Sequence, residues 1–234
     1  MTFVLDGFVV ELFSMATAKL KEKKPRQLTV EEYLEAERES PERHEFIDGQ
    51  IYQMAGESGR HGDVSVNITR EISLQLKGKE CRARSKDTKI KSGGFSQRKT
   101  NSTKGMFSYP DLVVICGEPE YHDKFKDIVL NPQVIVEVLS DSTEVFDRNA
   151  KFTRYRMFNQ TLTDYILVSQ DKPMVEHFIR QDDNNWNLNI YLGLDKTLEV
   201  ESIECSLRLS EIYDRIKFSK ETHQLLREIA DLQK

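Results

Sequence analysis

Short runs of apolar residues dominate the middle of the chain, and they have the length and composition of buried strands. Asp111–Cys116 and Val134–Leu139 are almost continuously apolar and rich in β-branched residues, and Tyr165–Val168 is a shorter third run. Such runs are typical of strands that are covered on both faces of a sheet. We therefore expect the three runs to form the centre of a sheet.

Three stretches have the periodicity or the capping signals of helices. The first follows Thr29-Val30-Glu31-Glu32, a capping-box sequence in which the Thr hydroxyl and the Glu carboxylate satisfy free amides, and it ends at Ser40-Pro41. The second covers residues 61–77, and the third is Asp147–Phe158. One face of the second helix is formed by His61, Val64, Ser65, Ile68, Ile72 and Leu76.

The order of these elements predicts the fold class. With the strand-like stretch 81–91 included, the middle of the chain reads α-β-β-β-α-β. This order predicts an α/β (α+β) domain with a mixed β-sheet, flanking helices and extra hairpins. Asp48-Gly49 between apolar flanks predicts one tight hairpin, and a later hairpin is predicted to pair residues 175–180 with 186–192.

The charge of the chain is unevenly distributed. The net charge is −5, but residues 77–104 hold ten basic and two acidic residues, so this segment is +8 and the rest is −13. A basic segment on an acidic protein favours contact with a polyanion, although a solvated strand and loop explains it equally well. The candidate nucleic-acid-binding residues are Arg82, Arg84, Lys86, Lys89 and Lys91.

Composition and cysteine content narrow the class of protein. Hydrophobic residues make up 38% and charged residues 31% of the chain, and no run approaches the ~20 apolar residues of a membrane span, so no membrane partner is expected. Cys81, Cys116 and Cys205 are odd in number and far apart. Their spacing predicts free thiols in a reducing cytosol, hence a cytoplasmic protein, without a disulfide framework or CxxC metal site.

Two carboxylates interrupt the apolar runs. Asp111 opens the first strand behind Pro110, and Glu137 lies inside Ile-Val-Glu-Val-Leu, where an isolated charge costs several kcal/mol unless it is paired or metal-bound. On antiparallel neighbouring strands, the two would lie side by side. Such an oxygen-rich pair suits Mg²⁺ or Mn²⁺. A turn or cap role for Asp111 and a structural ion pair for Glu137 remain alternatives.

Three further residues are candidates for the same site. Lys151 lies in line with the apolar face of its predicted helix, from which it can reach the carboxylates or extend to solvent. His61, at the start of its helix, can ligate a metal or move a proton, but a packed histidine is an equally ordinary interpretation. Glu45, at the start of the Asp-Gly hairpin, completes a metal shell or is a surface acid.

An ordered series of motifs resembles the PD-(D/E)XK nuclease superfamily. Tyr109-Pro110-Asp111 is followed by Val136-Glu137-Val138-Leu139-Ser140 and then by Lys151 in the next helix. More narrowly, the series is similar to a restriction-endonuclease-like family that is abundant in cyanobacteria, and the similarity covers about Leu28 to Phe218. Further matching segments are Leu28–Leu34, Glu45–Gly49, His61, Asp164–Val168 and the late hairpin.

The resemblance implies a restriction-endonuclease-like fold that hydrolyses DNA, with Asp111, Glu137 and Lys151 as its catalytic residues. The superfamily's usual lysine stands two residues after the strand acid, and this chain has Leu139 there. The resemblance therefore implies that the lysine has moved to the following helix, at Lys151. The basic segment 77–104 would then track the phosphate backbone.

The favoured function is a Mg²⁺- or Mn²⁺-dependent endonuclease without an organic cofactor, in which Asp111, Glu137 and Glu45 hold the metal and His61 assists. Two other functions remain open. A non-catalytic, nuclease-like protein that forms a homodimer through the late hairpin or the tail fits the overall acidity of the chain, because DNA-binding domains are usually basic. A metal hydrolase of small phosphoesters would use the same acids.

We expect three regions along the chain. They are a flexible leader over 1–27, a nuclease-like domain over 28–218 and a helical tail over 219–234. A short helix capped by Ser210 precedes the tail, and Met15 is a candidate start codon.

Overall fold

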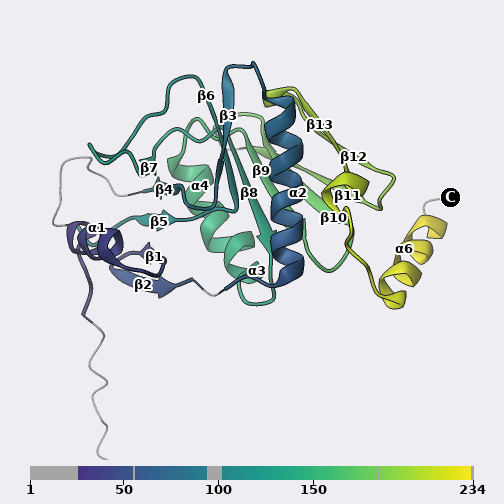
Figure 1. Cartoon of the computed structure of the whole chain (residues 1–234), viewed down its shortest axis with the longest axis horizontal. Helices are drawn as coiled ribbons and strands as arrows, with labels where there is room; N and C mark the ends of the chain where they lie inside the picture. The colour runs from purple at the N-terminus through teal and green to yellow at the C-terminus, as the bar shows by residue number, and fades with distance from the viewer. Residues whose placement is uncertain (1–25, 55, 94–101, 184, 233–234) are drawn as a thin grey trace, which may run out of the picture.

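The computed structural model describes residues 26–54, 56–93, 102–183 and 185–232. The predicted leader falls almost entirely outside these residues. Within them, the chain forms a six-stranded sheet, a five-stranded sheet and a two-stranded sheet, with helices on their faces (Figure 1). In the ranges described, no helix has the length and apolar character needed to cross a bilayer.

The six-stranded mixed sheet has the strand order β11-β10-β9-β8-β6-β3. Strands β8 and β9 run parallel, and the other neighbouring pairs are antiparallel. All of β8 and β9 and most of β6 are buried, which confirms that the apolar runs are covered on both faces. The strands are β3 (Cys81–Ser85), β6 (Leu112–Cys116), β8 (Val134–Leu139), β9 (Asp164–Ser169), β10 (Met174–Arg180) and β11 (Trp186–Leu192).

Helices cover both faces of this sheet (Figure 1). α2 (Gly59–Gln75) packs on one face through the predicted apolar positions, and α4 (Phe152–Phe158) packs on the other through Phe152 and Tyr155. Because successive strand residues point to opposite faces, β8 turns its valines toward α2 and turns Glu137 toward α4. The chain order α2-β3-β6-β8-α4-β9 is the predicted α-β-β-β-α-β series, so the fold class is confirmed.

A second sheet has the order β2-β1-β5-β4-β7, and α1 (Val30–Glu39) packs on it. The predicted capping box at Thr29 is present, and the Asp48-Gly49 turn joins the predicted hairpin. The apolar pattern of the sequence does not reveal this second sheet, because its strands are only two to four residues long. The strands are β1 (His44–Ile47), β2 (Gln50–Gln53), β4 (Lys89–Ser92), β5 (Met106–Ser108) and β7 (Ile128–Val129).

The C-terminal part adds the late hairpin β10–β11, which is confirmed, and a small hairpin with one more helix. β12 (Thr197–Val200), the 3₁₀ turn η2 (Glu201–Ile203) and β13 (Cys205–Arg208) precede α5 (Leu209–Ile212). The prediction that Ser210 caps a short helix is wrong: the helix α5 begins at Leu209, and its buried residues are Leu209 and Ile212. The amphipathic tail forms α6 (Lys220–Leu232).

The prediction of three free thiols is also wrong. Cys81 and Cys116 form a disulfide, and only Cys205 is a free thiol. The two cysteines are 35 residues apart in sequence but lie directly opposite each other on the antiparallel strands β3 and β6. The register of that strand pair, which sequence spacing does not reveal, creates the pair.

Candidate active site

The candidate site lies where the chain passes from the second sheet to the first. β5 belongs to the five-stranded sheet and β6 to the six-stranded sheet, and the link between them is Tyr109-Pro110-Asp111. Glu45 comes from β1, which pairs with β5. Residues from both sheets therefore meet at this junction. The helical segment that follows β8 also reaches it, through Lys151.

Asp111 directly precedes β6, the strand that pairs with β8, which carries Glu137. β6 and β8 are antiparallel with Leu112 opposite Val136, so the same register continues to Asp111 opposite Glu137. The backbone N–H of Val138 donates to Asp111 Oδ2 at 2.7 Å. The Asp111 side chain is 13% exposed, so the carboxylate is held firmly yet remains open to a ligand.

Glu137 is buried and paired with Lys151. Its residue is 4% exposed, and the Lys151 Nζ lies 2.9 Å from Glu137 Oε1. The same amine lies 3.1 Å from Glu45 Oε1, and the Tyr155 hydroxyl donates to Glu137 Oε1 at 3.3 Å. The structure thus brings Glu45, Glu137 and Lys151 into one cluster. The charge of Glu137 is therefore not isolated, because Lys151 is its partner.

A π-helical turn presents Lys151 to these acids. The helix predicted over Asp147–Phe158 begins as the short α3 (Glu144–Phe146), widens into the π turn η1 (Asp147–Lys151), and continues as α4. Such π turns inside helices occur frequently at functional sites. The turn points Lys151 inward and sets Asp147 beside it, with Asp147 Oδ1 3.3 Å from the Lys151 Nζ.

Asp147 is a member of the cluster that the sequence analysis missed. It is 2% exposed, although helix starts on a protein surface often carry a solvated acid. The available signal was its position four residues before Lys151, the spacing at which opposite charges meet on a helix.

Burial and repulsion shift the protonation of the cluster. Burial raises the pKa of Glu137 well above its ordinary value; Lys151 lowers it, and the charges of Asp147, Asp111 and Glu45 raise it further. Burial likewise raises the pKa of Asp147, against the opposing charge of Lys151. Burial alone would lower the pKa of Lys151, but Glu137, Glu45 and Asp147 together raise it well above the usual range. The lysine therefore stays charged.

His61 and Glu57 extend the cluster on the outer side of Asp111. Ser58 caps α2, and His61 in the first turn donates from Nε2 to Asp111 Oδ1 at 2.9 Å. Burial lowers the pKa of His61, but Asp111 outweighs it and the net shift is upward. Ligand atoms of Glu57, His61 and Asp111 all lie within 4.8 Å of one another. Glu57, which the sequence analysis did not single out, also pairs with Lys86.

Among the described residues, the donor set that fits a divalent cation by proximity is Glu57, His61 and Asp111, and the buried acids around Lys151 lie on its inner side. The carboxylates of Glu45, Glu137 and Asp147 face the Lys151 ammonium, and with Asp111 and Glu57 the carboxyl groups of the cluster outnumber its cationic groups. Carboxylate oxygens suit Mg²⁺, and an added imidazole suits Mn²⁺. Lys151 engages Glu45 and Glu137, whereas Asp111 faces outward to His61, so Asp111 joins the two halves of the cluster.

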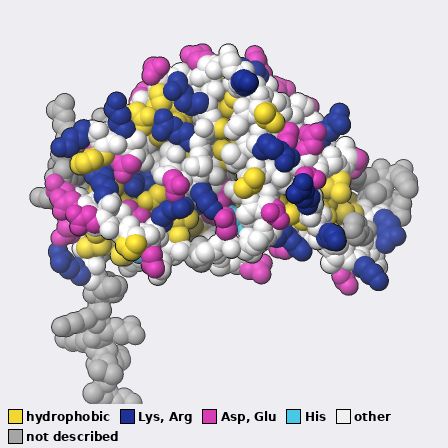
Figure 2. Space-filling view, viewed as in Figure 1, with side chains coloured by type: hydrophobic (Ala, Val, Ile, Leu, Met, Phe, Trp, Pro, Cys, Tyr) yellow, Lys and Arg dark blue, Asp and Glu magenta, His cyan; other side chains and the backbone are white. Residues whose placement is uncertain are grey.

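The candidate nucleic-acid-binding residues have different surroundings. Arg82 is exposed, and Arg84 donates to the Tyr121 hydroxyl at 2.6 Å. Lys86 pairs with Glu57 at 2.5 Å and is 39% exposed, so it lies beside the outer half of the cluster. Figure 2 shows basic and acidic side chains interspersed over the face it views.

Two of these basic residues are not free to meet a phosphate. The Lys89 side chain is 7% exposed, and its Nζ lies 3.0 Å from Asp127 Oδ2. Lys91 is half-buried, its Nζ lies 3.4 Å from the His122 ring, and burial lowers its pKa. Both belong to β4 in the second sheet, whose packing the charge pattern did not reveal. The burial and pairing of Lys89 contradict the prediction that it contacts phosphate, and the packing of Lys91 against His122 argues against the same prediction for Lys91.

Comparison with known proteins identifies the class. The model of the Uma2 family, described as "Putative restriction endonuclease", matches residues 30–210, and the chain belongs to this family. A solved structure described as "a putative nuclease belonging to DUF820" from Anabaena variabilis is similar, with a TM-score of 0.62 and 17% identity. That alignment covers 81% of this chain and 99% of the other, and it shows that the fold is shared.

Two similar proteins come from Synechocystis sp. "Uncharacterized protein slr1290" is 34% identical over 82% of this chain and 94% of its own length. "Uncharacterized protein sll1609" is 33% identical over 74% of this chain and 92% of its own length. These similarities agree with the resemblance to a cyanobacterial, restriction-endonuclease-like family.

Proposed function

We propose that this protein is a metal-dependent endonuclease that hydrolyses phosphodiester bonds of DNA. The observation that carries the proposal is the cluster at the junction of the two sheets, where Lys151 meets Glu45 and Glu137 on the strand next to Asp111. A buried lysine among carboxylates, next to the partly exposed Asp111, supplies the cation and the carboxylates that phosphoryl hydrolysis needs. Membership of the Uma2 family, whose description is "Putative restriction endonuclease", supports the same reaction class.

Each residue has a role that follows from its position. Asp111 and Glu137, with Glu45, would hold Mg²⁺ or Mn²⁺, and His61 and Glu57, whose ligand atoms lie within 4.8 Å of that of Asp111, would be further ligands on the outer side. Such a cation, when bound, polarises a phosphoryl oxygen and lowers the pKa of a bound water. Lys151 stays protonated, orients the attacking water and offsets the negative charge that develops on the phosphoryl oxygens. Tyr155 fixes the Glu137 carboxylate through its hydrogen bond.

The direct test is cleavage of supercoiled plasmid with added Mg²⁺ or Mn²⁺. We expect nicked and linear products with either cation and none after chelation with EDTA. A protein that binds neither cation and cleaves no DNA would contradict the proposal. Turnover of a chromogenic phosphodiester without plasmid cleavage would instead support a hydrolase of small phosphoesters.

We expect the exposed side of β3 to contribute to DNA binding. Replacing Arg82, Arg84 and Lys86 together by glutamine should flatten the salt dependence of DNA affinity by about 0.9 per phosphate contact that is lost. The matched control is the exposed Lys196, which belongs to the β11–β12 turn. The measurement is fluorescence anisotropy of a labelled duplex at several salt concentrations. An unchanged slope in the triple variant would place the contact surface elsewhere.

A specific surface favours the second candidate, a homodimer. β11 is an edge strand of the six-stranded sheet, and its Leu188 and Ile190 are 45% and 59% exposed. No residue of β11 is charged, so two copies can pair edge to edge without repulsion, whereas the opposite edge strand β3 carries Arg82 and Arg84. A groove of about 1080 Å³ lies beside β11, lined by Ile190, Leu192, Phe218, Leu226 and Ile229.

Ile190→Lys should convert such a dimer to a monomer, because a charged side chain on an edge strand blocks pairing with a second copy. Light scattering after size-exclusion chromatography measures the mass of each variant. Val66→Lys is the control, since Val66 is also exposed, at 65%, but lies on α2. A monomeric wild-type protein would contradict the proposed dimer and leave the nuclease proposal standing.

A further inference from the structure

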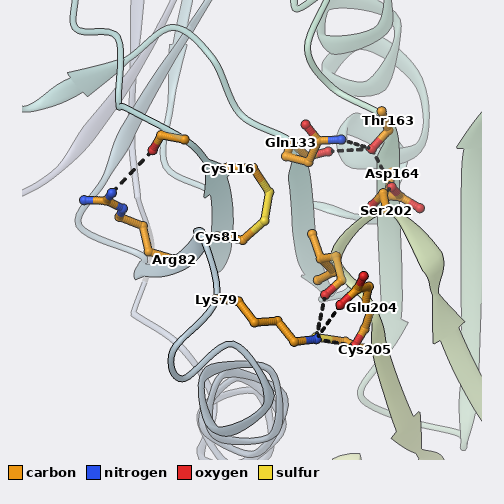
Figure 3. Close-up of a disulfide and its surroundings, with 12 residues drawn as sticks. Lys79, Cys81, Arg82, Cys116, Gln133, Thr163, Asp164, Ser202, Glu204 and Cys205 are labelled. Atoms are coloured by element: carbon orange, nitrogen blue, oxygen red, sulfur yellow. Dashed lines mark hydrogen bonds and ion pairs between the residues drawn. A yellow bond between two sulfur atoms is a disulfide. The ribbon is translucent and has the colours of Figure 1, made fainter.

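The Cys81–Cys116 disulfide joins the first residue of β3 to the last residue of β6 (Figure 3). Both cysteines are half-buried at the margin of the apolar core that faces α2. A disulfide is often essential in small secreted domains, whose cores are too small to hold the fold alone. Here two large apolar clusters already cover the faces of the central sheet, so the bond is not needed to assemble the core.

Strand β3 lies at the edge of the six-stranded sheet, so one of its two sides has no strand partner among the described residues. It pairs with β6 over its whole length, from Cys81 opposite Cys116 to Ser85 opposite Leu112. Toward α2 it offers only Cys81 and Ala83, which bury little apolar surface. On the other side, Arg82 and Arg84 each donate one hydrogen bond to the 117–121 loop, and Figure 3 shows Arg82 directed away from the disulfide. Lys79, just before the strand, donates to the Glu204 carbonyl at 2.8 Å, and the disulfide adds the covalent link at this end of β3 (Figure 3).

The third cysteine, Cys205, is more buried than the other two. Cys205 is 2% exposed, and its thiol donates to the Ile203 carbonyl at 3.5 Å. Burial also raises the pKa of this thiol, so little of it is the reactive thiolate. Of the three cysteines, Cys81 and Cys116 are the pair that a thiol reagent can reach.

We propose that Cys81 and Cys116 form a reversible dithiol–disulfide modification site that controls the order of β3. A small dithiol attacks one sulfur as the thiolate and forms a mixed disulfide, and its second thiol then displaces the protein sulfur. The protein disulfide is reduced to two thiols, and the dithiol is oxidised to a disulfide, with two electrons and two protons transferred. Once reduced, β3 opens from the sheet edge, and Arg82 and Arg84 lose their fixed positions.

Hydrogen–deuterium exchange of the oxidised protein and of the dithiothreitol-reduced protein tests this proposal. The peptide that covers Cys81–Ser85 should exchange about tenfold faster after reduction, while the peptide that covers Asp164–Ser169 in the sheet interior should not change. Iodoacetamide should label Cys81 and Cys116 only after reduction. A Cys81→Ser, Cys116→Ser double variant should show the fast exchange without reductant, and Cys205→Ser should leave the exchange unchanged.

The proposal is overturned if exchange of β3 is the same in both redox states, or if Cys81 and Cys116 are alkylated in protein that was never reduced. These measurements need neither DNA nor metal. Their outcome is therefore independent of whether the proposed nuclease activity is found.

Discussion

Asp111→Asn should reduce metal-dependent DNA cleavage by about a thousandfold or more and leave the fold intact. The loss corresponds to the several kcal/mol of transition-state stabilisation that a catalytic cation supplies, at about 1.4 kcal/mol per tenfold in rate. The asparagine carbonyl can still accept the Val138 N–H bond, so the strand register is preserved. The substitution also removes one negative charge from an acidic cluster, so the melting temperature should stay equal or rise slightly.

Two measurements separate the role of Asp111 in metal binding from its role in the fold. Calorimetric titration with Mn²⁺ should show a large loss of affinity in Asp111→Asn, while circular dichroism remains that of the wild type. Asp171→Asn is the matched control, because Asp171 is a 63% exposed acid that pairs with Arg60 outside the cluster. If Asp111→Asn binds Mn²⁺ and cleaves plasmid as the wild type does, the proposed metal position is wrong.

Lys151→Met should lower the free energy of unfolding by about 3–5 kcal/mol at neutral pH, which is the usual cost of removing one partner from a buried ion pair. The side chains of Lys151, Glu137 and Asp147 are each 5% exposed or less, so water does not screen the carboxylates that remain. Glu45, which is 13% exposed, loses the same partner. Chemical denaturation measures the change. Lys196→Met, at a 53% exposed lysine, should change stability by no more than about 0.5 kcal/mol.

The loss in Lys151→Met should shrink as the pH falls. The pKa values of Glu137 and Asp147 lie above their ordinary values in the folded protein, and removing the lysine charge raises them further. The folded variant then binds more protons than the unfolded chain, so its stability rises as pH falls through these raised pKa values toward the ordinary carboxylate range. A stability deficit that is constant between pH 7 and pH 5 would contradict a cluster held together by this lysine.

Lys151→Met therefore also tests whether cleavage activity depends on the lysine. We expect the variant to lose cleavage activity, but the loss is attributable to the lysine only under conditions where the variant is folded. Lys151→Arg retains the charge with a larger, planar group, so it should recover part of the stability but not the activity. Recovery of both by arginine would indicate that charge alone matters at this position.

Local patterns along the chain determined most of the secondary structure. The apolar runs at 112–116 and 134–139 are strands because uninterrupted β-branched residues suit positions covered on both faces. Thr29 begins α1 because its hydroxyl and the Glu32 carboxylate satisfy the free amides of the first turn. Asp111, Glu137 and Lys151 stood out because charged residues at apolar positions need partners, and that requirement is visible in the sequence.

Only the tertiary structure decided which residues share the site. Glu45 reaches Lys151 because the chain crosses from one sheet to the other at Pro110, and no local pattern records that crossing. Strand register sets Cys81 against Cys116, and packing of the second sheet buries Lys89 beside Asp127. Burial, pairing and shifted pKa values depend on which distant segments come into contact. The sequence by itself therefore determined the helices and strands and the charged residues at their apolar positions. The tertiary structure determined which of those residues meet.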